Sequence, residues 1–236
     1  MRKLFCSILV LQSLHAYAQL NDLGTWNILN LKLNITDKWS LFGEGQIRSL
    51  KFYNNFHYFE YKGGVNFKAH KLIMLSLGAG SYQTFKEGGN FVTPKNNNEI
   101  RIWPQVVLSH SFKNFSIEHR YRAEFRFTLN GYRNRFRYRL GFSYKFGKDK
   151  KGFKPFKVTI NNEIFLTDKL PFFERNRVAG SFFYSPLKEL TLQLGYIHQF
   201  DNRLNDEIGR SFLQLGIYYE YSIKKKNSSK LESTKN

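Results

Sequence analysis

Long apolar segments are missing from nearly all of this sequence. Beyond the N-terminus no apolar run approaches the ~20 residues that a membrane-spanning helix needs. The mean hydropathy is −0.48, which also excludes a helical membrane bundle. Aromatic residues make up 17% of the chain, which argues against disorder. A soluble β-rich protein, a basic nucleic-acid binder and an outer-membrane barrel remain.

Cysteine is nearly absent as well, since the single one is Cys6. It lies in an apolar stretch, residues 4–14, which follows two basic residues and precedes the Ala-Tyr-Ala sequence at 16–18. These features predict a secretory signal peptide over residues 1–18, cleaved before Gln19. The mature chain would then have no cysteine, which excludes a disulfide scaffold, a zinc–thiolate site and a cysteine nucleophile.

Acidic residues are scarce: 18 Asp and Glu stand against 37 Lys and Arg, a formal net charge of +19. Removal of Arg2 and Lys3 with the signal peptide lowers this charge to +17. A strongly basic chain often binds nucleic acid, but an exported one does not meet it, so we expect no nucleic-acid partner. Residues 224–236 are basic and polar and are predicted to form a disordered tail.

Period-two alternation is what the sequence does contain. In residues 115–128 one set of alternate positions is mostly aromatic or aliphatic and the other is mostly charged, and residues 133–146 repeat the pattern. Side chains alternate between two faces along a strand. Both segments are therefore predicted to be strands with one apolar and one charged face.

An Asn-Gly pair at residues 130–131 separates these two segments and is a favoured two-residue hairpin turn. A turn there predicts that Phe125 faces Phe136 and that Glu124 faces Arg137. Both alternations stay in phase across this register, as a hairpin with one apolar face requires.

A second hairpin is predicted upstream, with its turn at Lys113 and Asn114. In this register Gln105 faces Arg122, and the alternation again stays in phase. Pro104 has no N–H to donate, so we expect a bulge or a local break in the pairing there.

Weaker alternation predicts nine further strands, and the whole pattern predicts an all-β fold: a transmembrane antiparallel β-barrel over residues 19–223. The nine segments lie near residues 25–34, 39–50, 56–68, 71–85, 98–111, 156–167, 175–185, 190–200 and 210–223. Longer polar connections are expected near 51–55, 86–97, 168–173 and 201–209. A soluble sandwich also alternates, but several of these strands are longer than its usual ~5–6 residues. Because bacterial barrels normally have an even number of strands, we expect about twelve, with one missed near 19–24 or 148–156, or else ten.

The charged face of such a barrel must point inward, since an Arg or Lys costs ~2–4 kcal/mol on the lipid face at mid-depth. We therefore predict a network of arginines and glutamates in the lumen. Its members are Glu99, Arg101, Glu118, Arg120, Arg122, Glu124, Arg126, Arg135, Arg137, Arg139, Glu163 and Arg177.

Three functions are compatible with this lumen. The first is a structural or passive barrel, held nearly shut by interlocked Arg–Glu pairs. The second is an anion-selective porin for small anions or acidic oligosaccharides, because the inward cations outnumber the acids. The third is an interfacial lipid-modifying enzyme using His110 and Ser111, but that histidine is predicted to face lipid. We expect no enzymatic activity, no catalytic or metal-binding residue and no cofactor.

Several motifs together resemble a family of Bacteroidota outer-membrane β-barrels, catalogued as domain of unknown function 2490. They are Glu99-x-Arg101-x-Trp103-x-Gln105, His119-Arg120-Tyr121-Arg122-x-Glu124-x-Arg126, Arg135-Phe136-Arg137-Tyr138-Arg139-Leu140, Asn162-Glu163-Ile164-Phe165, Asn176-Arg177-x-x-Gly180 and Gly195-Tyr196-x-x-Gln199. The resemblance implies an outer-membrane barrel and supplies no activity. From the barrel interpretation we expect location in the outer membrane, contact with its lipid and lipopolysaccharide, and insertion by the barrel assembly machinery.

Overall fold

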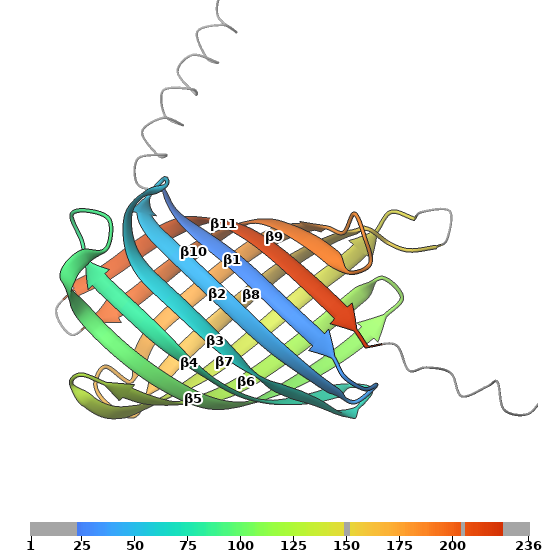
Figure 1. The fold of residues 1–236 in the computed structure, drawn as a ribbon, viewed down its shortest axis with the longest axis horizontal. Helices are drawn as coiled ribbons and strands as arrows, with labels where there is room; N and C mark the ends of the chain where they lie inside the picture. Colours follow the sequence, from blue (N-terminus) through green and yellow to red (C-terminus); the bar gives the residue numbers. More distant parts are fainter. Residues whose placement is uncertain (1–22, 149–151, 204–205, 224–236) are drawn as a thin grey trace, which may run out of the picture.

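The computed structural model describes residues 23–148, 152–203 and 206–223. Over these residues the chain forms eleven strands that close into one barrel, with the strands tilted across the barrel axis (Figure 1). The strands are β1 (Leu23–Asn34), β2 (Trp39–Lys51), β3 (Asn54–His70), β4 (Ile73–Lys86), β5 (Val92–Phe112), β6 (Phe115–Thr128), β7 (Gly131–Phe146), β8 (Phe156–Thr167), β9 (Phe173–Tyr184), β10 (Leu190–Arg203) and β11 (Asp206–Ser222). No helix of the described residues is long and apolar enough to cross a membrane.

All consecutive strands pair antiparallel, and β1 pairs with β11 in parallel to close the barrel. The expected twelve strands, and the alternative of ten, are therefore wrong for the described part of the chain. An even number is needed only when the first and last strands pair antiparallel, whereas here twelve residue pairs join two strands that run the same way. Of the two places proposed for a missed strand, residues 152–155 are not in a strand, and 19–22 and 149–151 lie outside the described residues. The expected signal peptide and tail also lie outside them.

Because the number of strands is odd, β1 begins at one end of the barrel, the N-end, and β11 finishes at the other, the C-end (Figure 1). The expected long connections are mostly absorbed into strands, since β5 already begins at Val92 and β11 at Asp206. At the N-end the connection between β4 and β5 is residues 87–91, whereas at the C-end the one between β7 and β8 is residues 147–155. The four connections that we expected to be long all lie at the N-end, and there the strands leave only two to five residues for each of them, so that expectation is wrong.

The hairpin of β6 and β7 forms as predicted, but its register is two residues away from the prediction. Glu124 faces Arg135 and Phe125 faces Asn134, with Thr128 opposite Gly131. The loop is thus residues 129–130, one position earlier than expected. Gly131 has a φ of +97° and closes the loop, as the glycine of a bulge does after a type I turn. A shift of two residues leaves every side chain on its predicted face.

The upstream register is confirmed, since Gln105 faces Arg122. Pairing between β5 and β6 is interrupted between Ile102↔Phe125 and Gln105↔Arg122, beside Pro104, and resumes without a register change. The expected local break is present and no bulge forms there, because proline only removes one donor from the ladder.

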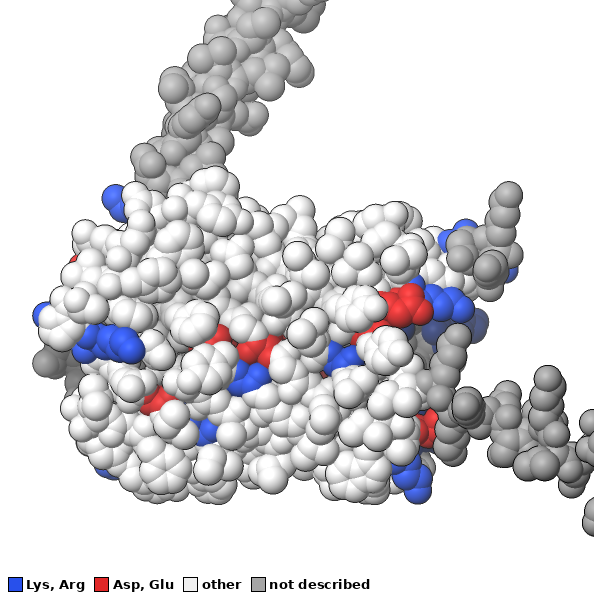
Figure 2. All heavy atoms as spheres, in the orientation of Figure 1, with Lys and Arg blue, Asp and Glu red and all other residues white. Residues whose placement is uncertain are grey.

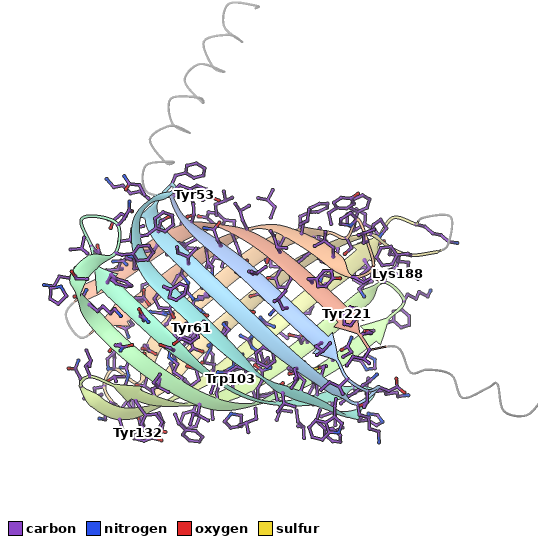
Figure 3. The ribbon with its side chains drawn as sticks, in the orientation of Figure 1. Tyr53, Tyr61, Trp103, Tyr132, Lys188 and Tyr221 are labelled. Carbon is purple, nitrogen blue, oxygen red and sulfur yellow. The ribbon has the colours of Figure 1, made fainter. Side chains whose placement is uncertain are left out.

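The outward face of the barrel is apolar, with aromatic side chains gathered towards both ends. Figure 2 shows one side of it, mostly uncharged, with charged atoms near the ends and in a narrow line between them. Of the residues labelled in Figure 3, Tyr53 and Tyr132 lie at the N-end and Tyr221 at the C-end. Outward aromatic pairs in contact include Phe127–Tyr132 near the N-end and Trp39–Phe67, Phe115–Tyr144 and Phe156–Tyr184 near the C-end.

A small apolar cluster occupies part of the interior, where β1 meets β9, β10 and β11. It consists of Trp26, Ala179, Ile197 and Phe212, all of them buried. Trp26 and Phe212 meet edge to face with ring centres 5.8 Å apart. The rest of the described interior combines polar and charged side chains with further buried aromatic rings, such as Trp103 and Phe165.

Candidate functional site: the charged lumen

A cavity of about 890 Å³ runs inside the barrel and is lined by side chains from all eleven strands. The lining extends from Glu87 and Arg210 near the N-end to Lys32 and Lys157 near the C-end. It contains fifteen Lys and Arg but only eight Asp and Glu. The wall of this lumen therefore carries a clear excess of positive charge.

The centre of the lumen contains a continuous chain of ion pairs, here called the ion-pair chain. Arginines and glutamates alternate along it across β5 to β9. In order, the contacts are Arg101 Nε–Glu99 2.8 Å, Glu99–Arg126, Arg126 Nη1–Glu174 3.2 Å, Glu174–Arg135 Nη1 3.2 Å, Arg135 Nη2–Glu124 2.5 Å, Glu124–Arg137 Nη1 2.6 Å, Arg137 Nη2–Glu163 2.8 Å and Glu163–Arg120 Nη2 2.6 Å.

Glu124 is the most enclosed acid of this chain, with an exposed fraction of 0%. Arg135 donates to it through Nε at 2.8 Å and Nη2 at 2.5 Å, and Arg137 donates through Nη1 at 2.6 Å. Arg122 and Arg101 lie slightly farther away, at 3.6 and 4.0 Å. The predicted contact with Arg137 is present, but as a diagonal contact, because the direct partner of Glu124 across the strands is Arg135.

Each acid of the chain serves more than one arginine. Glu174 accepts from Arg126, Arg133 and Arg135 at 3.1–3.2 Å, and Glu163 accepts from Arg120 and Arg137. Arginine stays charged at all accessible pH values. The shared carboxylates therefore offset the repulsion between neighbouring guanidinium groups. Seven arginines and four glutamates take part in these contacts, which leaves the network itself positive.

Two arginines make their hydrogen bonds to amides instead of carboxylates. Arg122 donates through Nε and Nη2 to Gln105 Oε1, at 2.9 and 2.6 Å, and its guanidinium lies 3.9 Å from the centre of the Trp103 ring. Arg177 donates to Gln199 Oε1 at 2.8 Å and lies over aromatic rings of the interior. A guanidinium on an aromatic face is attracted to it but keeps its full charge.

The ring of Trp103 can lie under the Arg122 guanidinium because the neighbouring strand leaves space for that ring. Trp103 is 1% exposed and faces Gly78 of β4. A Cβ at Gly78 would lie 2.2 Å from Trp103 Cζ2, well inside van der Waals contact. A glycine in the strand thus permits this close approach.

Smaller groups of charges lie outside the ion-pair chain. Arg139 pairs with Glu118 at 2.6 Å, and Arg175 pairs with Asp201. On β2 and β3, Arg48, Glu60, Lys62 and Glu44 form a second, shorter series of pairs. Arg48 also lies between the rings of Trp26 and Tyr58, at 3.4 and 4.1 Å from their centres.

All twelve residues predicted for the lumen lie on β5 to β9 with their side chains in the barrel interior. Glu174 was missed, although three arginines contact it. The pairing of β8 and β9 shifts between Phe165 and Leu166, so Glu174 and Arg175 both face the interior. Strict alternation cannot predict this, and the sequence carries no clear signal for the bulge.

The alternative lipid-modifying site receives no support from geometry. His110 pairs with Ile117 across β5 and β6 on the outward side of the sheet, as expected. Among the described residues, no group of three or more His, Cys, Asp or Glu side chains could hold a metal ion.

The fold defines the class of protein as a closed β-barrel with a basic, ion-paired lumen. The chain belongs to the family DUF2490, described as proteins of unknown function, whose family model matches residues 23–210. A comparison with curated proteins gives no match. The matched segment contains all twelve residues predicted for the lumen.

Proposed function

We propose that the protein is an outer-membrane β-barrel whose lumen admits small anions. The observation that carries this proposal is the cavity of about 890 Å³, with fifteen basic and eight acidic side chains along it. A positive wall in a confined, low-dielectric space concentrates anions and repels cations.

The outward face supports placement in a membrane. A strand of twelve residues such as β1, with a rise of ~3.3 Å per residue and a tilt of ~40°, spans roughly 30 Å along the barrel axis. This length fits the ~25 Å apolar band of outer-membrane barrels, which is flanked by aromatic girdles. The outward aromatic residues near both ends and the expected signal peptide agree with this location.

Lipopolysaccharide and phospholipid are the partners that this outer surface would meet, and the barrel assembly machinery is the proposed route of insertion. Recovery of the mature protein, beginning at Gln19, in the outer-membrane fraction is the expected result. Recovery as a soluble periplasmic protein without detergent would exclude the membrane proposal.

Conductance in a planar lipid bilayer tests the lumen directly. Under a KCl gradient, the purified barrel should carry current. Its reversal potential should be shifted from zero towards the equilibrium potential of chloride. Arg177→Gln removes a lumen cation that makes no ion pair among the described residues, so this variant should reduce the anion selectivity. Lys188→Gln is the matched control, because Lys188 is exposed in the connection between β9 and β10 at the C-end (Figure 3).

A passive structural barrel is the second candidate, and the ion-pair chain favours it. Interlocked arginines and glutamates across five strands brace the wall and narrow the lumen. Absence of any current above the lipid background, in protein shown to be folded by its heat-dependent mobility in gels, would favour this candidate and reject the anion pathway.

A further inference from the structure

Four arginines form a compact block on β6 and β7, here called the arginine block. Arg120 faces Arg139 and Arg122 faces Arg137 as direct cross-strand partners. Direct partners have Cβ atoms ~4.5–5.5 Å apart, and like charges in such positions are destabilising. Each of these two pairs continues sideways into a row of cross-strand partners on β8 and β9. The two rows contain one acid there, because Arg139 faces Glu163, which in turn faces Arg177.

The nearby acids do not use all the donors of the block. Each guanidinium has five N–H donors. Arg122 directs two of its nitrogens to the neutral oxygen of Gln105, and Arg139 reaches Glu118 through Nη2. Arg120 reaches Glu163 through Nη2, but its Nε is buried with no hydrogen-bond partner among the described residues.

All four members of the block line the cavity, so a solute in the lumen can reach them. An oxyanion with several acceptor oxygens matches the planar fork of a guanidinium, because two N–H groups can bond to it side by side. Chloride is a single spherical acceptor and gains nothing from this geometry. A buried, unpaired donor adds to the gain when an acceptor arrives.

We propose that the arginine block binds a tetrahedral oxyanion, the phosphate group of inorganic phosphate or of a small phosphate ester. This inference rests on the proposed function, in that the lumen must admit solute, and it names the class of anion that the lumen selects. Bound phosphate separates the four like charges and accepts from donors that otherwise bond to Gln105 or, as Arg120 Nε, have no partner among the described residues.

Calorimetric titration of the complete mature barrel in detergent tests the proposal. Inorganic phosphate and glycerol phosphate are titrated separately, at constant ionic strength set with chloride, and the two arms distinguish the free ion from an ester. Saturable binding of one or both at a single site per barrel is expected. Absence of saturable binding by both would overturn the proposal.

Variants locate the site. Arg122→Gln and Arg120→Gln should each weaken phosphate binding about tenfold or more, since each loses charge-assisted hydrogen bonds. Arg122→Lys keeps the charge but not the fork and should also weaken it, whereas Lys188→Gln, outside the lumen, should bind as the wild type does. Equal phosphate affinity in Arg122→Gln, Arg120→Gln and wild type would overturn the assignment.

Anion competition and bilayer conductance complete the test. If the glutamine variants fail to fold, competition for the wild-type barrel decides. Sulfate should displace bound phosphate and equimolar chloride should not, so displacement by chloride would overturn the proposal. Bilayer conductance separates this inference from the proposed function. Anion-selective current without saturable phosphate binding would reject the arginine block alone, and absence of both would reject the two together.

Discussion

The lumen has two walls that satisfy their buried polar groups in different ways. The charged wall, on β5 to β9, uses mainly the four carboxylates of the ion-pair chain, each shared by two or more arginines. The amide wall, on β9 to β11, uses neutral pairs: Gln193 Nε2 donates to Gln214 Oε1 at 2.6 Å and to Ser181 Oγ at 2.9 Å, and Tyr218 donates to Gln193 Oε1 at 2.5 Å.

The difference between the walls lies in what remains when one partner is removed. In the amide wall a lost side chain leaves at most one or two neutral groups unbonded, a cost of about 1–3 kcal/mol each when buried. In the charged wall a lost carboxylate leaves several guanidiniums close together, and their repulsion is added to the lost bonds. The charged wall is therefore the more fragile one.

The largest effect is expected from Glu124→Gln. This change removes the acid that Arg135 and Arg137 share, at a site with no exposed surface. The free energy of unfolding should fall by roughly 3–5 kcal/mol, as measured by denaturant unfolding of the mature barrel in detergent. Added salt should restore little of the loss, since a buried site is poorly screened. A loss below about 1 kcal/mol would show that the site is wet and exposed.

An intermediate effect is expected from Gln214→Met in the amide wall. Gln193 keeps its bond to Ser181 at 2.9 Å, so the change removes the bond between Gln193 and Gln214 and a weak 3.4 Å contact from Ser181 Oγ to Gln214. Unfolding free energy should fall by about 1 kcal/mol, and the loss should be the same at low and high salt because no charge changes. A loss as large as that of Glu124→Gln would remove the contrast between the two walls.

A smaller effect is expected from Glu118→Gln, the control for Glu124→Gln within the charged wall. Among the described residues Glu118 pairs with Arg139 alone, and the two side chains are 38% and 29% exposed. A pair this accessible to solvent contributes about 0–1 kcal/mol. The same unfolding experiment should give a loss in that range that high salt abolishes. Persistence of the full loss at high salt would contradict the screening argument.

The smallest effect on stability is expected from a pair of cysteine substitutions. They test the register between β6 and β7, which places Glu124 opposite Arg135. Phe125→Cys with Asn134→Cys places two thiols opposite each other on the outward face, and they should oxidise to a disulfide with little change in stability. Phe125→Cys with Phe136→Cys is the control and should not cross-link efficiently. The reverse result would restore the register with Glu124 opposite Arg137. Peptide mapping after mild oxidation reads out both, since the sequence after residue 18 has no other cysteine.

Local patterns account for most of the fold. The eleven predicted segments overlap the eleven strands, and the inward placement of the twelve lumen residues follows from period two alone. The hairpin at Lys113 and Asn114 was also predictable, because short turns and alternation restrict the register together. The hairpin at Gly131 shows the limit of this reasoning. Asn-Gly is compatible with two turn geometries that differ by two residues in register, and both keep the same faces.

The tertiary structure decided what depends on closure and on contacts between distant segments. Parallel pairing of β1 with β11 closes the barrel at eleven strands in the described part of the chain. No local signal encodes this pairing, because the partners are nearly two hundred residues apart in the chain. The bulge that turns Glu174 inward, and the choice of which arginines share which acid, depend on how the strands align once the barrel has closed. Sequence alone determined that arginines and glutamates would meet in the interior, because period two sets the face of each side chain. The closed barrel alone determined that Arg122 and Arg177 would direct their hydrogen bonds to glutamines and lie over aromatic rings.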